Sequence, residues 1–229
     1  MIRLDERIAA GMRLQLAARA ERLRAGERPL GWKVGFGSPA AGERLGIDRP
    51  LVGFLLESNL LPDGAEVPVT GWAAPALEPE IAVHLARDVE PDASQDAVRD
   101  ALAGLSAAIE LADVDPPPTD VREILAGNIY HRHVLLGPVR EGHAGTEGIT
   151  ARLRLDGEQV AATDDVTTLT GELVEVVRLT AELLGACGER LRAGEVVITG
   201  SVLPPLPVSA GQRVEVDLGP LGGLSVALG

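Results

Sequence analysis

A single lysine, Lys33, stands in the apolar and glycine-rich segment GWKVGF. The chain holds 21 lysine and arginine residues, and the other 20 are arginines. Arginine keeps its proton near neutral pH, whereas a desolvated lysine can release it and act as a general acid or base. A lysine that extends from a strand to reach solvent is the alternative. The use of lysine at this one position makes Lys33 a candidate acid/base group.

Three glutamates lie in two segments with β-strand character. Glu78 and Glu80 are two residues apart in EPEIAVHL, so their side chains share one face of the predicted strand. Glu110 lies in AAIELADVD among small and apolar residues, where an unpaired carboxylate would be costly. Either each glutamate faces water or the three share a cation. Ligation by carboxylates alone favours Mg²⁺, Mn²⁺ or Ca²⁺ over Zn²⁺.

Hydrophobic periodicity predicts the elements that position these side chains. Helices are expected at 4–25, 94–104, 120–127 and 169–185, strands at 31–36, 51–57, 78–89, 107–115, 128–137, 195–201, 212–218 and 224–228, and a hairpin at 151–162 around Asp156-Gly157. Long β-rich regions joined by Gly/Pro turns favour a rolled or barrel-like sheet over alternating βαβ units. The expected fold class is mixed α/β, rich in β, with flanking helices.

Composition excludes several classes of function. The net charge of −13 argues against a nucleic-acid partner and against an anionic membrane surface. No apolar run is long enough to span a bilayer, and the N-terminus lacks the apolar core of a signal peptide. With Cys187 as the one cysteine, no intramolecular disulfide can form. These features predict a cytoplasmic protein.

Several segments, taken in order, carry a resemblance to a known family. They are GWKVGF, LGIDRPLVGFLLES, ALEPEIAVHL, AAIELADVD, GNIYHRHVLLG and VVITGSVLPPLPVSAGQRVEVDLGPLGGLSV. From about residue 30 to the end, the chain resembles the fumarylacetoacetate hydrolase superfamily. Within it, the similarity is to the branch of 2-hydroxypenta-2,4-dienoate (2-keto-4-pentenoate) hydratases and oxalocrotonate decarboxylases.

The resemblance implies a single domain over residues 1–229, with a helical lead at 1–28 and a catalytic β-roll at 29–229. It implies a metal ion, Mg²⁺ or Mn²⁺, and a small-molecule 2-keto acid substrate that reacts through a metal-stabilised enolate. It also implies assembly as a homo-oligomer. The implied site residues are Lys33 for acid/base catalysis, Glu78, Glu80 and Glu110 for the metal, and Thr199, Gly200, Ser201, Asn128 and Arg132 for the substrate.

Two of the departures from the family pattern concern Ser58 and the residues after Asn128. The family usually has an aspartate near Ser58, but here the nearest acid is Glu57, which a one-residue offset would turn to the other face of a strand. After Asn128 the family commonly has small residues, whereas this chain has IYHRH. These larger and more basic residues either lie at a surface or reshape the pocket, in which case Arg132 or a histidine grips a second carboxylate of the substrate.

Three functions remain open at this point. The first is a metal-dependent hydratase or lyase acting on a 2-keto acid. The second is a decarboxylase or C–C hydrolase acting on an acylpyruvate or an oxalocrotonate-like acid. A hydrolase would need a group such as His84 beside Glu80 to activate water, but we expect His84 to be structural. The third is a degenerate, non-catalytic homologue.

Overall fold

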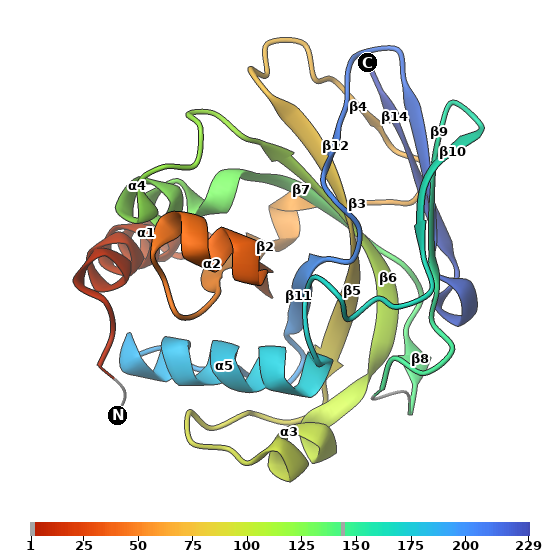
Figure 1. The fold of residues 1–229 in the computed structure, drawn as a ribbon. Coiled ribbons are helices and arrows are strands. Elements are labelled where there is room, and N and C mark those ends of the chain that lie inside the picture. Colours follow the sequence, from red (N-terminus) through yellow and green to blue (C-terminus); the bar gives the residue numbers. More distant parts are fainter. Residues whose placement is uncertain (1–2, 143–144) are drawn as a thin grey trace.

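The computed structural model describes residues 3–142 and 145–229. Within them the fold is mixed α/β and strand-rich, as expected, with two sheets of nine and five strands (Figure 1). The helices are α1 Glu6–Arg24, α2 Pro39–Leu45, α3 Gln95–Ala101, α4 Val121–Ala126 and α5 Leu173–Ala186. The strands are β1 Pro29–Gly35, β2 Leu51–Leu56, β3 Leu60–Leu61, β4 Glu66–Val67, β5 Pro75–Leu85, β6 Leu102–Asp113, β7 His131–Leu136, β8 Arg140–Glu141, β9 Ala151–Leu155, β10 Glu158–Thr163, β11 Val196–Ser201, β12 Leu206–Pro207, β13 Arg213–Asp217 and β14 Gly223–Leu228.

The larger sheet follows the order β2-β1-β11-β5-β6-β7-β3, with β12 also paired to β5 and β8 to β6. The long antiparallel pair of β5 and β6 lies at its centre. The smaller sheet follows the order β10-β9-β13-β14-β4 and lies on the opposite side of the molecule from α1, α2 and α4 (Figure 1). The larger sheet is strongly curled, as the sequence predicted for a rolled sheet.

Both faces of the central strands are buried, because apolar residues cover each side. On β5, Ile81 and Val83 belong to the main core, as the alternation of the sequence predicted. On the opposite face, Ala82 of β5 packs with Leu55 and Ile198 in a second, smaller apolar cluster. That second face also carries Glu78 and Glu80, since side chains two apart on a strand share a face.

Helix α1 packs against α4 and against β2. Asp5 caps its first turn by accepting a hydrogen bond from the backbone N–H of Arg7. Inside the interface, the buried Gln15 donates through Nε2 to the carbonyl oxygens of Val52, at 3.1 Å, and Leu125, at 2.9 Å. One side chain therefore joins three elements. No helix among the described residues has the length and apolarity needed to cross a membrane.

Most predicted elements are present, but some boundaries moved. Helix α5 begins at Leu173 rather than at 169, because Gly171 takes a left-handed backbone conformation with φ of 77° just before it. Helix α3 ends at Ala101, and strand β6 begins at once. Asp156 and Gly157 both have positive φ, 52° and 86°, which fits the predicted tight hairpin between β9 and β10.

Two local structures were not indicated by the sequence patterns. Helix α2 has only seven residues and too few apolar positions to give a periodic signal. Ser38 caps its start by accepting from the N–H of Ala41, and Gly46 ends it in a left-handed conformation. The expected strand at 128–137 begins only at His131, because the backbone of 128–130 forms a left-handed turn instead.

Candidate active site

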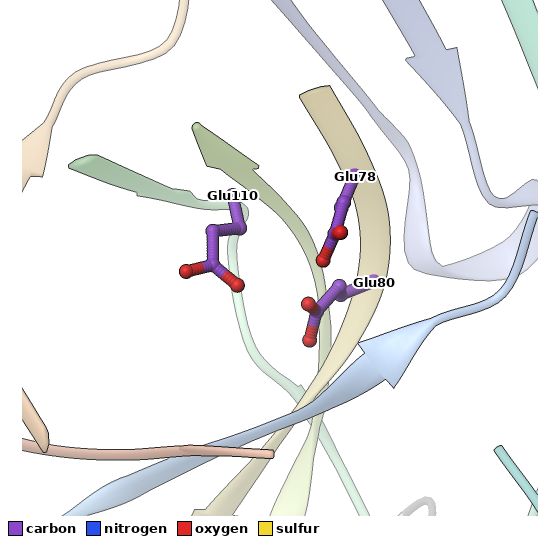
Figure 2. A group of neighbouring side chains, drawn as sticks. All are labelled: Glu78, Glu80 and Glu110. Carbon is purple, nitrogen blue, oxygen red and sulfur yellow. The ribbon is translucent and has the colours of Figure 1, made fainter. Parts of the chain in front are cut away.

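The three glutamates predicted to act together lie together. In the register of β5 and β6, Glu78 stands directly opposite Glu110, and Glu80 follows on the same face. Each carboxylate offers one oxygen within 4.8 Å of the others, and the three groups point toward one another (Figure 2). Glu80 and Glu110 are fully buried, whereas Glu78 is half-buried.

Each of the two buried carboxylates has one fixed oxygen and one that has no partner among the described residues. Glu80 Oε2 accepts a hydrogen bond of 2.8 Å from the backbone N–H of Gly200, while its Oε1 has no partner within residues 3–142 and 145–229. Glu110 Oε1 accepts from Lys33 and from His131, while its Oε2 has no partner in that same part of the chain. Buried polar atoms without partners are rare and costly, so these two oxygens fit the role of ligands to a hard divalent cation.

The electrostatics of the cluster point the same way. Burial, together with repulsion from Glu110, raises the pKa of Glu78 to about 7. Burial, with repulsion from Glu110 and Glu78, raises the pKa of Glu80 well above its usual range. Burial would also raise the pKa of Glu110, but the Lys33 ammonium and the hydrogen bond from His131 outweigh it and lower that pKa. A divalent cation would stabilise all three as carboxylates.

Lys33 does not reach solvent as an exposed side chain. Its exposed fraction is 2%, and its Nζ donates to Glu110 Oε1 and, at 3.0 Å, to the carbonyl oxygen of Ile129. Strand β1 pairs with β11, so Lys33 lies beside Ile198 and on the same face of the sheet as the glutamates. The surface alternative for this lysine is thereby excluded.

His131 is a member of the site that sequence reasoning did not place. Its Nδ1 lies 2.8 Å from Glu110 Oε1, and its buried Nε2 has no partner in the described part of the chain. Burial lowers the pKa of His131, so the neutral ring donates from Nδ1 to the carboxylate. The sequence marked the segment IYHRH as unusual for the family. The register shift between β6 and β7 pairs His131 with Ala112, and this pairing brings the ring to the cluster.

His84, by contrast, has the structural role that we expected. Its Nε2 forms a hydrogen bond of 2.9 Å with Ser106 Oγ on the neighbouring strand β6. It does not belong to the carboxylate cluster among the described residues. His84 therefore does not supply the histidine beside Glu80 that a hydrolase would need to activate water.

A cavity of about 510 Å³ opens beside the cluster. Lys33 and Glu78 lie in its wall, as do Thr199, Gly200 and Ser201, which the family resemblance implied as substrate-binding residues. The remaining wall is largely apolar and is formed mainly by Val34, Phe36, Pro50, Ala112, Val114, Ile129, Leu169, Val176, Leu179, Pro204 and Pro205. The cavity therefore has a polar region at the carboxylates and a long apolar stretch of wall, and Arg44, Glu172 and Glu175 also line it.

Two residues predicted to bind the substrate do not line this cavity. Arg132 is 52% exposed, and it pairs with Asp113 at 3.1 Å while lying over the ring of Trp72. The Asn128 side chain is bound to the backbone of Phe54. Arg44, on α2, is the arginine found in the cavity wall. The basic residues after Asn128 therefore divide: His131 reaches the cluster and Arg132 turns to the surface.

The chain is similar over most of its length to proteins named as hydratases. It is 31% identical over 204 residues to a 2-keto-4-pentenoate hydratase of Burkholderia vietnamiensis, a match that covers 87% of this chain and 78% of that enzyme. It is 29% identical over 207 residues to a 2-hydroxyhexa-2,4-dienoate hydratase of Comamonas testosteroni, covering 88% and 78%.

The fold is also found in solved structures. The 4-oxalocrotonate decarboxylase of Pseudomonas putida G7, complexed with magnesium and adipate, superposes with a TM-score of 0.90 at 23% identity, covering 96% of this chain and 86% of that one. The family model described as fumarylacetoacetate (FAA) hydrolase C-terminal matches residues 34–228, so this chain belongs to the fumarylacetoacetate hydrolase family.

Proposed function

We propose that the protein is a divalent-metal-dependent hydratase that adds water to a 2-keto, 2-hydroxydienoic type of acid. The observation that carries the proposal is the cluster of Glu78, Glu80 and Glu110, in which two buried oxygens lack a partner among the residues that the structure describes. The similarity to hydratases at about 30% identity supports the reaction class.

Glu78, Glu80 and Glu110 would hold Mg²⁺ or Mn²⁺, because all three offer hard oxygen donors. When bound, such an ion supplies positive charge that favours loss of a proton next to the carbonyl group of a 2-keto acid. Lys33 holds the complementary position, since it lines the cavity and touches Glu110. We assign it the proton transfers at C3 or C5 of the substrate.

The chain's own residues also define the substrate's position. The backbone N–H of Gly200 holds Glu80, while Thr199 is fixed by donating to the carbonyl oxygen of Ile81 at 3.0 Å. Both residues form the cavity wall next to Lys33. The acid group of the substrate would lie in this polar region, and its carbon chain would lie along the apolar stretch of wall.

Binding of oxalate, a planar mimic of an enolised 2-keto acid, tests this proposal. Calorimetry should show oxalate binding that requires Mg²⁺ or Mn²⁺ and weakens at least about 100-fold in Glu80→Gln, since even the partners of metal ligands change affinity by 10- to 100-fold. Glu195→Gln is the matched control, because Glu195 is a buried glutamate that bonds Trp32 and the N–H of Arg192 instead.

Absence of metal-dependent binding in the wild type would overturn the proposal and favour the non-catalytic homologue. If binding is present, a screen of keto acids then separates hydration from decarboxylation. A 24% identical relative, a 4-oxalocrotonate decarboxylase of a Pseudomonas species, makes that the reaction to test beside hydration. We further propose that the enzyme works as a cytoplasmic homo-oligomer, which sedimentation and fractionation would measure.

A further inference from the structure

Three consecutive residues at the site adopt a backbone conformation that L-residues avoid. Asn128, Ile129 and Tyr130 have φ values of 54°, 51° and 62°. Asparagine tolerates this left-handed region, but a β-branched and an aromatic residue do so at a cost of roughly 1–2 kcal/mol each. Such a turn persists only where surrounding contacts hold it, and strained turns concentrate at functional sites.

The contacts that hold the turn come from Asn128. Its Oδ1 accepts a hydrogen bond of 2.8 Å from the backbone N–H of Phe54, and its Nδ2 donates at 2.9 Å to the carbonyl oxygen of the same residue. Phe54 lies on β2, the edge strand of the larger sheet. The amide therefore occupies this edge as a neighbouring strand would, with both hydrogen bonds formed.

The part of β2 that Asn128 binds lies next to Lys33. In the pairing of β1 with β2, Phe54 faces Trp32 and Gly53 faces Lys33. A Cβ atom on Gly53 would lie 2.9 Å from Asn128 Oδ1 and 2.9 Å from Lys33 Cγ. Because Gly53 has no side chain, the Asn128 amide and the aliphatic part of Lys33 can both pack against its Cα.

The turn presents its own backbone to the lysine. The carbonyl oxygen of Ile129 accepts from Lys33 Nζ at 3.0 Å. The Ile129 side chain is 3% exposed and packs against Gly35, where an added Cβ would lie 3.0 Å from Ile129 Cγ2. A lysine ammonium has three N–H donors. Ile129 and Glu110 take two, which leaves one for the cavity that Lys33 lines.

We propose that Asn128 is a positioning residue for Lys33, and that it does not contact the substrate. Its amide clamps the left-handed turn to β2, and the turn sets the Ile129 carbonyl that orients the ammonium group. The catalytic meaning of this arrangement rests on the proposed function, but the arrangement itself can be tested in the metal-free protein.

Lys33 makes the test direct, because selective ¹³C,¹⁵N-lysine labelling gives the side-chain NMR signals of one residue only. Asn128→Gly keeps a residue that tolerates positive φ and removes only the clasp. We expect the Lys33 Cε and Hε signals to shift and to report larger motion. For any keto acid that the enzyme converts, kcat should fall about 10- to 100-fold with little change in KM, because a small misplacement of a catalytic group has effects of that size.

Asn59→Ala is the matched control. Asn59 Nδ2 also donates to the backbone of this segment, to the carbonyl oxygen of Arg132 at 2.8 Å, but it does so outside the turn. The control should leave the Lys33 signals in place. Asn128→Asp, which keeps the acceptor for the Phe54 N–H and also tolerates positive φ, carries the test if the glycine variant does not fold.

Unchanged Lys33 signals in a folded Asn128 variant would overturn the proposal. Failure of both variants to fold would also overturn it, since Asn128 would then serve the fold rather than the lysine. A shifted lysine signal together with no metal-dependent oxalate binding in the wild type would leave the positioning role intact and overturn the proposed function instead.

Discussion

A single oxygen atom, Oε1 of Glu110, joins Lys33 and His131 at the centre of the site. It accepts from both Lys33 and His131, while Oε2 has no partner among the described residues. Residue identity alone marked the lysine and the glutamate, because both types are unusual in apolar surroundings. It could not mark His131, because a histidine near a predicted strand is most often structural, as His84 is here.

We therefore predict that His131→Leu weakens binding of Mn²⁺ by about 10- to 100-fold, the usual effect of removing a partner of a ligand. The hydrogen bond that orients the Glu110 carboxylate would be lost, while the volume of the side chain would be largely kept. Titration with Mn²⁺ followed by paramagnetic relaxation of water measures this directly. His84→Leu should bind Mn²⁺ like the wild type, and equal effects of the two substitutions would contradict the role of His131.

At the scale of elements, helix α1 packs against α4 and β2, which lie next to the site. Gln15 connects it to β2 and α4 through two backbone carbonyls. Strand β2 in turn carries Gly53 and Phe54, which meet Lys33 and Asn128. Helix α1, which lies within the expected helical lead at 1–28, thus contacts β2, the strand that pairs with the Lys33 strand β1.

We predict that Gln15→Leu lowers the free energy of unfolding by about 1–3 kcal/mol, because the carbonyls of Val52 and Leu125 would stay buried without donors. Urea denaturation measures the change. Gln95→Leu, at the exposed start of α3, should alter stability by no more than about 0.5 kcal/mol. A Gln15 variant as stable as the wild type would show that α1 does not depend on this contact.

Some elements could be predicted from local sequence patterns, and others could not. Alternation on β5 and the Asp-Gly pair of the hairpin predicted their elements because those signals lie within the element. The left-handed turn at 128–130 could not be predicted, since β-branched and aromatic residues favour a strand there. A tertiary contact, the amide of Asn128 on Phe54, overrides that preference.

For the molecule as a whole, the buried carboxylates tie stability to pH. Glu78 has a pKa of about 7 in the folded protein, against 4.5 for an ordinary glutamate, and Glu80 is shifted in the same direction. As pH rises above 4.5, the unfolded chain releases protons that the folded protein still holds. The contribution of these groups to stability is therefore present at low pH and lost as pH rises through about 7 and beyond.

We predict that Glu78 makes the free energy of unfolding of the metal-free protein fall between about pH 5 and pH 8, and that this contribution is absent in Glu78→Gln. Mg²⁺ or Mn²⁺ should stabilise the protein most at the upper end of this range, because the ligands bind metal as carboxylates. Urea denaturation at several pH values, with and without metal, measures both effects. A Glu78→Gln variant with the pH dependence of the wild type would contradict the assignment.

The sequence by itself determined the lone lysine, the shared face of Glu78 and Glu80, most helices and strands, and a rolled β-rich fold, because these features depend on residue type and short-range periodicity. Only the tertiary structure decided which side chains meet. Lys33 and Glu110 are 77 residues apart, and their contact depends on the register of β1, β11, β5 and β6. Likewise, the register shift between β6 and β7 places His131 at the carboxylate cluster, whereas Arg132 pairs with Asp113 and lies at the surface. Pairing across a sheet depends on packing over the whole chain, so no local pattern specifies it.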